Sequence, residues 1–326
     1  MVQAFQTPIT AAEVKAKARE LGADLVGIAD GTVMNANPPY PDQPQRPSDI
    51  SDHDADRVIV LAQRVSLGAA RILDWSDRHK YYNDELTITA LEEIALDLVR
   101  WLERLGYPAL IMPGTHINPW SYHGDPDLHQ RPPLSLEHAA VEAGLGTLGL
   151  NLQLLTPEYG PRVILTSVLS SVPVAADKPM EASLCAGPEC GRCLTVCPGD
   201  AVKHWDRDWE ACDTYRHPHG FKKLNKFLGD VIDESDTDNQ KRMLRNEDSF
   251  HLWTSILRGA GAITGCRRCQ DVCPVGADYE EMLKDALDDI PEDSADKQKR
   301  LKVMRDATKR GETGAGHAAQ KRWIGG

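Results

Sequence analysis

The residues most able to do chemistry are eight cysteines between positions 185 and 273 of this 326-residue chain. Two runs, Cys190 to Pro198 and Cys266 to Pro274, share the pattern C-x2-C-x3-C-P. In such paired runs, the cysteine before proline ligates the other iron–sulfur cluster. The spacing predicts two [4Fe-4S] clusters, held by Cys185, Cys190, Cys193 and Cys273 and by Cys197, Cys212, Cys266 and Cys269.

Two other uses of the cysteines fit less well. A zinc ribbon also uses C-x2-C pairs, but it requires no crossed fourth ligand followed by proline. Disulfides require an oxidising compartment, and residues 1–8 contain no basic, apolar or twin-arginine export signal.

No stretch reaches the roughly 18 apolar residues of a membrane span. We therefore expect a cytoplasmic protein with no membrane partner.

The charge balance is acidic, with a net charge of −12 from 49 acidic and 37 basic residues. A protein that binds nucleic acid usually carries a basic surface. The acidic runs at 233–238 and 288–293 are typical of solvated surface. From this composition we expect no nucleic-acid partner.

The confinement of the cysteines divides the chain into three parts. We expect a first domain over residues 1–178, a cluster-bearing domain over 179–285 and a charged tail over 286–326. The 53 residues between Cys212 and Cys266 predict a helical insert over 213–265, with helices at about 221–233 and 239–259. In the tail we expect helix to about residue 310 and disorder after it.

Hydrophobic patterning of the first domain alternates between helical and extended segments. A capping box at Thr10 to Glu13 starts a helix that Gly22 ends, and an apolar stripe predicts a long helix over 83–106. A short helix is expected over 135–143, and long loops over 31–56 and 113–133. Strands are expected over 24–29, 57–62, 108–112 and 162–170. The fold class is therefore α+β, a mixed sheet flanked by helices.

The run Gly144-Leu-Gly-Thr-Leu-Gly149 matches the G-x-G-x-x-G pattern of dinucleotide-binding folds. That fingerprint needs a preceding strand and a following helix. Here a helical segment precedes the run, and Leu154-Leu-Thr-Pro157 is a poor helix start. The context disfavours a dinucleotide site, although a glycine-rich turn lets a backbone approach a large flat cofactor closely.

The runs from Ser135 to Asn151 and from Leu154 to Val163 resemble cobalamin-dependent reductive dehalogenases and their relatives, the epoxyqueuosine reductases. The isolated Cys212 matches as well, and the resemblance covers about residues 10 to 275. It implies a nitroreductase-like cobalamin-binding domain followed by a two-[4Fe-4S] ferredoxin-like domain. Cobalamin would bind base-off between the two, and one cluster would lie near the corrin.

The resemblance also assigns residues to the cofactor. Those matching the corrin-binding stretch are Gly144, Leu145, Gly146, Thr147, Leu148, Gly149, Asn151, Tyr159 and Pro161. The electron donor implied is a ferredoxin, a flavodoxin or a flavin reductase.

The proton donor is the least defined part of the resemblance. Dehalogenases pair a tyrosine near the start of the long helix, where this chain has Tyr81 and Tyr82, with a basic residue. That basic position is Ile164 here, with Arg162 close by, two residues before it. The polar loop of the third strand adds Tyr122. Candidates for the chemistry are thus Tyr82, Tyr122, Tyr81 and Arg162.

Epoxyqueuosine reductases carry an aspartate before the Ala-Gly-Leu-Gly segment, in a region that reads Gln130-Arg-Pro-Pro133 here. The helical-repeat tail that they use on tRNA is also expected to be absent. We therefore expect a cobalamin-dependent iron–sulfur reductase acting on a small organic substrate such as an organohalide. The alternatives are an epoxyqueuosine reductase-like enzyme, a cobalamin-handling protein and a simple electron-transfer ferredoxin module.

Overall fold

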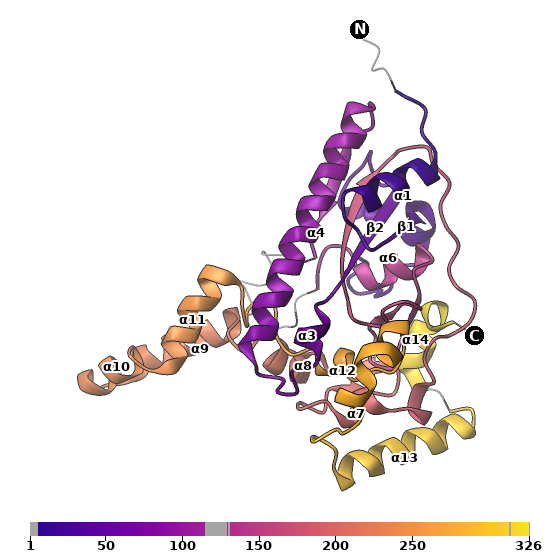
Figure 1. The fold of residues 1–326 in the computed structure, drawn as a ribbon. Helices are drawn as coiled ribbons and strands as arrows, with labels where there is room; N and C mark the ends of the chain where they lie inside the picture. The colour runs from indigo at the N-terminus through magenta and orange to yellow at the C-terminus, as the bar shows by residue number, and fades with distance from the viewer. Residues whose placement is uncertain (1–5, 115–128, 130, 313, 326) are drawn as a thin grey trace.

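The computed structural model describes residues 6–114, 129, 131–312 and 314–325 (Figure 1). Its main sheet has four strands in the order β1-β2-β6-β3. These are β1 (Leu25–Asp30), β2 (Arg57–Arg64), β6 (Val163–Ser170) and β3 (Ala109–Met112). The four predicted strands are all present.

The neighbouring strands of this sheet are all antiparallel, so the expectation of a mixed sheet is wrong. The reason lies in strand order. Both β2 and β3 pair with β6, so they run in the same direction and are joined by α4 (Arg78–Arg104) across one face. Because β6 lies between them, the two strands of this crossover never pair with each other.

Helices cover both faces of the sheet. The helix α1 (Ala11–Glu20), capped by Thr10 as predicted, packs with α4 on one face. On the opposite face lies α6 (Leu136–Glu142), whose buried side chains join those of β2 and of β4. The sheet is therefore the middle layer between two apolar cores.

The loops of this part hold short elements that the sequence did not predict. They are α2 (Gly31–Ala36), η1 (Pro47–Asp49) and α3 (Leu67–Ala70). Two small hairpins follow, β4 (Thr147–Leu148) with β5 (Leu154–Leu155) and β7 (Val202–Lys203) with β8 (Asp206–Arg207). The first hairpin lies between α6 and the cysteine-bearing segments.

The cysteine-bearing part consists of short helical segments. They are η2 (Gly187–Glu189), α7 (Arg192–Thr195), α8 (Trp209–Arg216), α12 (Arg268–Asp271), the π-helical turn η3 (Tyr279–Leu283) and η4 (Lys284–Ala286).

The predicted helical insert projects from one side of the molecule as α9 (Phe221–Asp233), α10 (Thr237–Met243) and α11 (Glu247–Arg258) (Figure 1). Its second helix was expected to be continuous over 239–259. Instead the chain breaks after α10, because the Asn246 side chain accepts a hydrogen bond from the Ser249 amide and starts a new helix.

The expectation of disorder after residue 310 is wrong. The tail forms α13 (Ala295–Lys309) and α14 (Gly314–Ile324). Trp323 is only 4% exposed, and its Nε1 donates to Oε1 of Glu142 at 2.9 Å. Leu301 and Ile324 pack into the apolar cluster that surrounds Cys185, Cys193 and Cys197. Burial of these apolar side chains outweighs the flexibility of the glycines around them.

Among the described helices, none is both long enough and apolar enough to cross a membrane.

Candidate functional site

The eight cysteines are all free thiols and are all partly buried. Burial raises the pKa of Cys266 to about 12, and the thiols of Cys269, Cys212 and Cys197 act in the same direction. The charge of a neighbouring thiolate acts on a pKa only at short range. These four cysteines therefore lie near one another, and their assignment to one cluster stays a prediction.

The remaining cysteines form the second group. Burial raises the pKa of Cys273 to about 12, and Cys185 and Cys190 add to the increase. Burial also raises the pKa of Cys193, with contributions from Cys273 and from Cys269 of the other group. The two groups therefore lie next to each other. Within the described ranges, no three Cys, His, Asp or Glu side chains converge on the position of a single metal ion.

A cavity of about 570 Å³ lies beside one of these groups. Cys212, Cys266 and Cys269 contribute to its lining, whereas Cys185 and Cys273 do not. Its volume is that of an ordinary ligand-binding site. The group formed by Cys197, Cys212, Cys266 and Cys269 is therefore the one closer to the cavity.

The cavity has an apolar wall and a set of lining cations, here called the cationic rim, which outnumber its acidic residues Asp84, Glu137, Glu210 and Asp213. The start of β6 and the turn before it supply the wall through Pro161, Val163, Ile164 and Leu165. Cations from α8, α9 and neighbouring segments line it as well: Arg131, Arg207, Arg216, Lys222, Lys223, Lys226 and Arg267. The net charge of the whole chain does not reflect this local positive charge.

Arg207 lines the cavity close to the cysteines that border it. Its guanidinium donates to the backbone carbonyl of Asn151 and lies 4.8 Å from the centre of the Trp209 ring. Burial alone would lower the pKa of this guanidinium, but Cys212, Cys269 and other acidic neighbours raise it above its ordinary value. Arg207 thus keeps a positive charge beside the cysteines that line the cavity.

The glycine-rich run lies against the cysteine-bearing segments. A Cβ on Gly146 would come within 1.8 Å of the Leu155 carbonyl oxygen, so this glycine permits a close approach of two segments of the chain. The Thr147 hydroxyl accepts a hydrogen bond from the amide of Leu184 at 3.0 Å. The amide of Leu150 donates to Sγ of Cys185 at 3.4 Å. The run and the residue that follows it therefore contact the segment that carries Cys185.

Of the residues that the resemblance assigns to the cofactor, Pro161 lines the cavity. The others lie outside its lining: Gly144, Leu145, Gly146, Thr147, Leu148, Gly149, Asn151 and Tyr159. The Asn151 side chain forms a hydrogen bond with Cys269, and the Asn151 backbone carbonyl accepts a hydrogen bond from Arg207. Their predicted contact with the cofactor stays a prediction.

Three of the four predicted chemical residues are described by the structure, and none of these three, Tyr81, Tyr82 and Arg162, lines the cavity. The Tyr81 hydroxyl donates to the Trp75 carbonyl at 3.0 Å, and burial raises the pKa of this tyrosine. The guanidinium groups of Arg78 and Arg258 lie 5.7 and 5.8 Å from the centre of the Tyr82 ring. Tyr122 lies outside the described residues.

Arg162 has a structural set of contacts. Its side chain is fully buried and forms two hydrogen bonds with Asp278, at 2.9 and 2.6 Å. It also donates to the carbonyls of Gln270, Cys273 and Val275. All of its guanidinium nitrogens thus bind the segment that carries Cys273. Ile164, two residues along the strand, lines the cavity instead.

Sequence reasoning missed an acidic residue in the cavity lining, Asp84 of α4. Its Oδ2 accepts from Nε of Arg267 at 2.6 Å, and Arg267 in turn donates to Asp271 at 2.6 Å. The ammonium of Lys80 completes the network, 2.7 Å from Asp271. The available signal was two charged residues one helical turn apart, Lys80 and Asp84, on an otherwise amphipathic helix.

A second missed pair is His129 with Asp213, both in the cavity lining. Nδ1 of His129 lies 2.6 Å from Oδ2 of Asp213, and its ring stacks on Trp209 with centroids 4.6 Å apart. Hydrogen bonding to His129 helps to lower the pKa of Asp213, against the effect of its burial. This pair brings the His129 side chain against α8.

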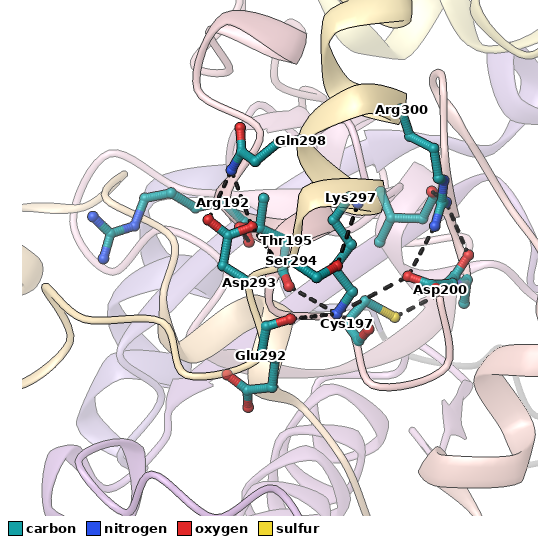
Figure 2. A network of polar contacts seen from close by, with 12 residues as sticks. Arg192, Thr195, Cys197, Asp200, Glu292, Asp293, Ser294, Lys297, Gln298 and Arg300 are labelled. Carbon is teal, nitrogen blue, oxygen red and sulfur yellow. Dashed lines mark hydrogen bonds and ion pairs between the residues drawn. The ribbon is translucent and has the colours of Figure 1, made fainter.

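The tail supplies a cation to the turn at Cys197 (Figure 2). Lys297 of α13 is 8% exposed, and its ammonium donates to the carbonyls of Thr195, Cys197 and Glu292, each at 2.9 Å. Nearby, Arg300 forms an ion pair with Asp200 at 2.8 Å. The predicted charged tail therefore helps to hold a predicted cluster ligand.

No protein-family model matches the chain. The epoxyqueuosine reductase of Bacillus cereus is 38% identical over 142 residues, which are 43% of this chain and 29% of that protein. That of Synechocystis sp. is 28% identical over 164 residues, 48% of this chain and 47% of that protein. The tetrachloroethene reductive dehalogenase of Sulfurospirillum multivorans is 39% identical over 72 residues, 22% of this chain and 14% of that protein.

Among solved structures, the catabolic reductive dehalogenase NpRdhA superposes with a TM-score of 0.53 at 17% identity. The match covers 95% of this chain and 37% of the dehalogenase. The chain therefore shares the fold of part of that protein. It spans less than half the length of each of these relatives.

The expectation that no nucleic acid is involved is wrong. The curated relatives include epoxyqueuosine reductases, enzymes named for a modified nucleoside. The physical error was to treat net charge as a property of every surface, since the cavity rim of this acidic chain is rich in lysine and arginine.

The prediction of an oxidoreductase is confirmed at the level of class, because these relatives are all named as reductive enzymes. The chain is related in sequence both to epoxyqueuosine reductases and to reductive dehalogenases, and it shares its fold with a reductive dehalogenase.

Proposed function

We propose that the chain is a cobalamin-dependent iron–sulfur reductase of the epoxyqueuosine reductase type. Its substrate would be an epoxide carried by tRNA. The observation that carries this proposal is the cavity, which three cysteines border and around which lysines and arginines gather. The sequence relatives support the epoxide over other reducible groups.

Two [4Fe-4S] clusters fit the cysteines. Thiolates are the usual ligands of such clusters, and the two groups of neighbouring thiols follow the crossed spacing. Cys197, Cys212, Cys266 and Cys269 would hold the cluster next to the cavity. Cys185, Cys190, Cys193 and Cys273 would hold the cluster farther from it, and the clusters would supply single electrons.

Cobalamin fits the cavity in chemical character. The apolar side chains Pro161, Val163, Ile164 and Leu165 would support a flat ring, and the cations of the rim suit the phosphate of a nucleotide tail. When bound, cobalamin supplies a strongly reducing and nucleophilic cobalt. The protein itself would position the substrate, exclude water and provide a proton.

The cationic rim also suits a polyanionic substrate. Arg216, Lys222, Lys223 and Lys226 come from α8 and α9, at the base of the helical insert. Phosphate groups of a nucleic acid bind lysine and arginine with little sequence preference. These residues would therefore hold the tRNA while its modified base enters the cavity.

Reduction of a small organohalide is the second candidate. The sequence match to a tetrachloroethene dehalogenase and the shared fold with NpRdhA favour it. Ile164 lines the cavity at the position where the dehalogenases carry a basic residue, which weakens it. A small substrate would have no need for the cationic rim.

Anaerobic reconstitution with iron, sulfide and cobalamin tests the proposal. The expected result is a base-off cobalamin spectrum and, with a reduced ferredoxin or flavodoxin, conversion of the epoxide in tRNA. Conversion of a halogenated phenol in place of the tRNA would select the second candidate. Protein that binds no cobalamin would rule out both.

The cluster assignment has its own test. Cys212→Ala should retain about half of the iron, because only the cluster near the cavity loses a ligand. Cys185→Ala is the matched variant and should lose the other cluster. Unchanged iron in Cys212→Ala would contradict the assignment.

A further inference from the structure

Asp84 is the acidic side chain that α4 contributes to the cavity. It is 5% exposed, and Ile88 from the next helical turn lines the same cavity. Oδ2 accepts the hydrogen bond from Arg267, whereas Oδ1 is buried and has no hydrogen-bond partner among the described residues. A buried carboxylate oxygen without a partner carries a desolvation cost that protonation removes.

Asp84 and its neighbour Asp271 differ in the number of cations that their carboxylates bind. Both oxygens of Asp271 bind cations, Oδ2 with Lys80 at 2.7 Å and Oδ1 with Arg267 at 2.6 Å. Within the part of the chain that the structure describes, Asp84 accepts a hydrogen bond from Arg267 alone, and Arg267 also binds Asp271. Burial raises the pKa of Asp84 to about 6, Arg267 and Lys80 oppose this increase, and Asp271 adds to it. Asp84 is thus the carboxyl of this network that exchanges its proton near neutral pH.

Two other described residues of the cavity that carry an exchangeable proton, Tyr40 and His129, are less suited to give it up there. Burial raises the pKa of Tyr40 to about 12, so its hydroxyl is a weak acid at neutral pH. His129 already forms a short hydrogen bond with Asp213 and stacks on Trp209. Tyr81, predicted from the sequence, lies outside the cavity lining and bonds to a backbone carbonyl.

We propose that Asp84 is the proton donor of the reduction, a role that rests on the proposed function. Removing an epoxide oxygen consumes two electrons and two protons and yields an alkene and water. A reduced ferredoxin or flavodoxin would supply the electrons. Asp84 would protonate the departing oxygen as its carbon–oxygen bond breaks and would regain its proton from solvent. Replacing a halogen by hydrogen consumes two electrons and one proton, which Asp84 would give to carbon.

Asp84→Asn tests this role in the reconstituted protein, with Asp97→Asn as the matched control on an exposed part of the same helix. Both variants should retain iron and bind cobalamin. Turnover should fall by about 100-fold or more in Asp84→Asn alone, the usual contribution of general acid catalysis. Full turnover in Asp84→Asn would overturn the proposal.

A second readout is independent of turnover. In the infrared spectrum of the wild-type protein, a carboxylic acid carbonyl band should disappear as the pH rises through about 6. The band should be absent in Asp84→Asn and retained in Asp97→Asn. If it persists in Asp84→Asn, the titrating group is another residue and the proposal fails.

These outcomes separate the two proposals. Wild-type protein that binds cobalamin and reduces neither substrate would contradict the proposed function, while the infrared titration still decides the protonation of Asp84. Should Asp84→Asn lose its clusters, Asp84→Glu keeps the carboxyl group with a longer side chain. Its pH–rate profile must then shift from that of the wild type, and an unshifted profile overturns the role.

Discussion

The ammonium of Lys80 lies 2.7 Å from Oδ2 of Asp271, and the two side chains are only 1% and 0% exposed. This ion pair joins α4 to α12, which lies between Cys266 and Cys273 in the sequence. Arg267 and Asp84 extend it into the cavity. The long helix is thereby fixed to the predicted cluster that borders the site.

Lys80→Met should destabilise the protein strongly. Removing one partner of a buried ion pair leaves an uncompensated charge, which costs about 3 to 5 kcal/mol. The expected result is earlier loss of the iron–sulfur absorbance in a denaturant titration. Lys241→Met is the control, because Lys241 forms an exposed pair with Asp238 and should change little. Equal stability of the two variants would contradict the structural role.

Arg162→Gln should affect the clusters before it affects the chemistry. The Arg162 guanidinium binds the carbonyls of Gln270, Cys273 and Val275, so its loss releases the turn that presents Cys273. We expect about half of the iron to be lost, since one cluster depends on that cysteine. Iron analysis and electron paramagnetic resonance measure this. Full iron content with lost turnover would instead restore the predicted chemical role of Arg162.

The strands were predictable because each is a short apolar run bounded by turn-forming residues. Their pairing was not, because the insertion of β6 between β2 and β3 depends on contacts between distant segments. The break before Asn246 was present in the sequence as Asn246-Glu-Asp-Ser249, a helix start that continuous apolar spacing concealed. The N-cap of this helix could therefore be recognised in the sequence, although the spacing of apolar residues suggested one continuous helix.

The candidate cluster ligands were predictable only as a hypothesis, because cysteine spacing is a sequence signature of cluster binding. The cavity acid was not, because the properties of Asp84 arise from burial and from Arg267, which lies 183 positions away. Similarly, the tail lacked a strong apolar pattern, yet Trp323 finds its partner in Glu142 of α6. Side chains whose function depends on a distant partner leave little trace in a single sequence.

Arg207→Gln should lower the reduction potential of the cluster near the cavity. The reduction potential of an iron–sulfur cluster depends on nearby charge and hydrogen bonds, and the lost cation would have stabilised the reduced state. Arg207 acts electrostatically on Cys212, Cys269 and other cysteines of that cluster. A redox titration followed by electron paramagnetic resonance measures the change, with Arg207→Lys as the charge-preserving control. Equal potentials in the two variants, with both clusters intact, would contradict this prediction.

The protonation of Asp84 should also make the free energy of unfolding depend on pH. Its pKa is raised from an ordinary value of 3.8 to about 6 in the folded state, so the folded protein binds this proton more tightly than the unfolded chain. The stabilising contribution is complete below about pH 4 and is lost as the pH rises through about 6. A shift of this size corresponds to roughly 3 kcal/mol.

Denaturant titrations at about pH 5 and pH 7.5 test this linkage. The wild-type protein should lose more unfolding free energy between the two values than Asp84→Asn, which has no proton to release. The groups that face Asp84 are Lys80, Arg267 and Asp271, and Asp97→Asn leaves them in place while removing an exposed carboxylate. That control should keep the wild-type pH dependence. An identical pH dependence in all three proteins would assign the titration to other groups.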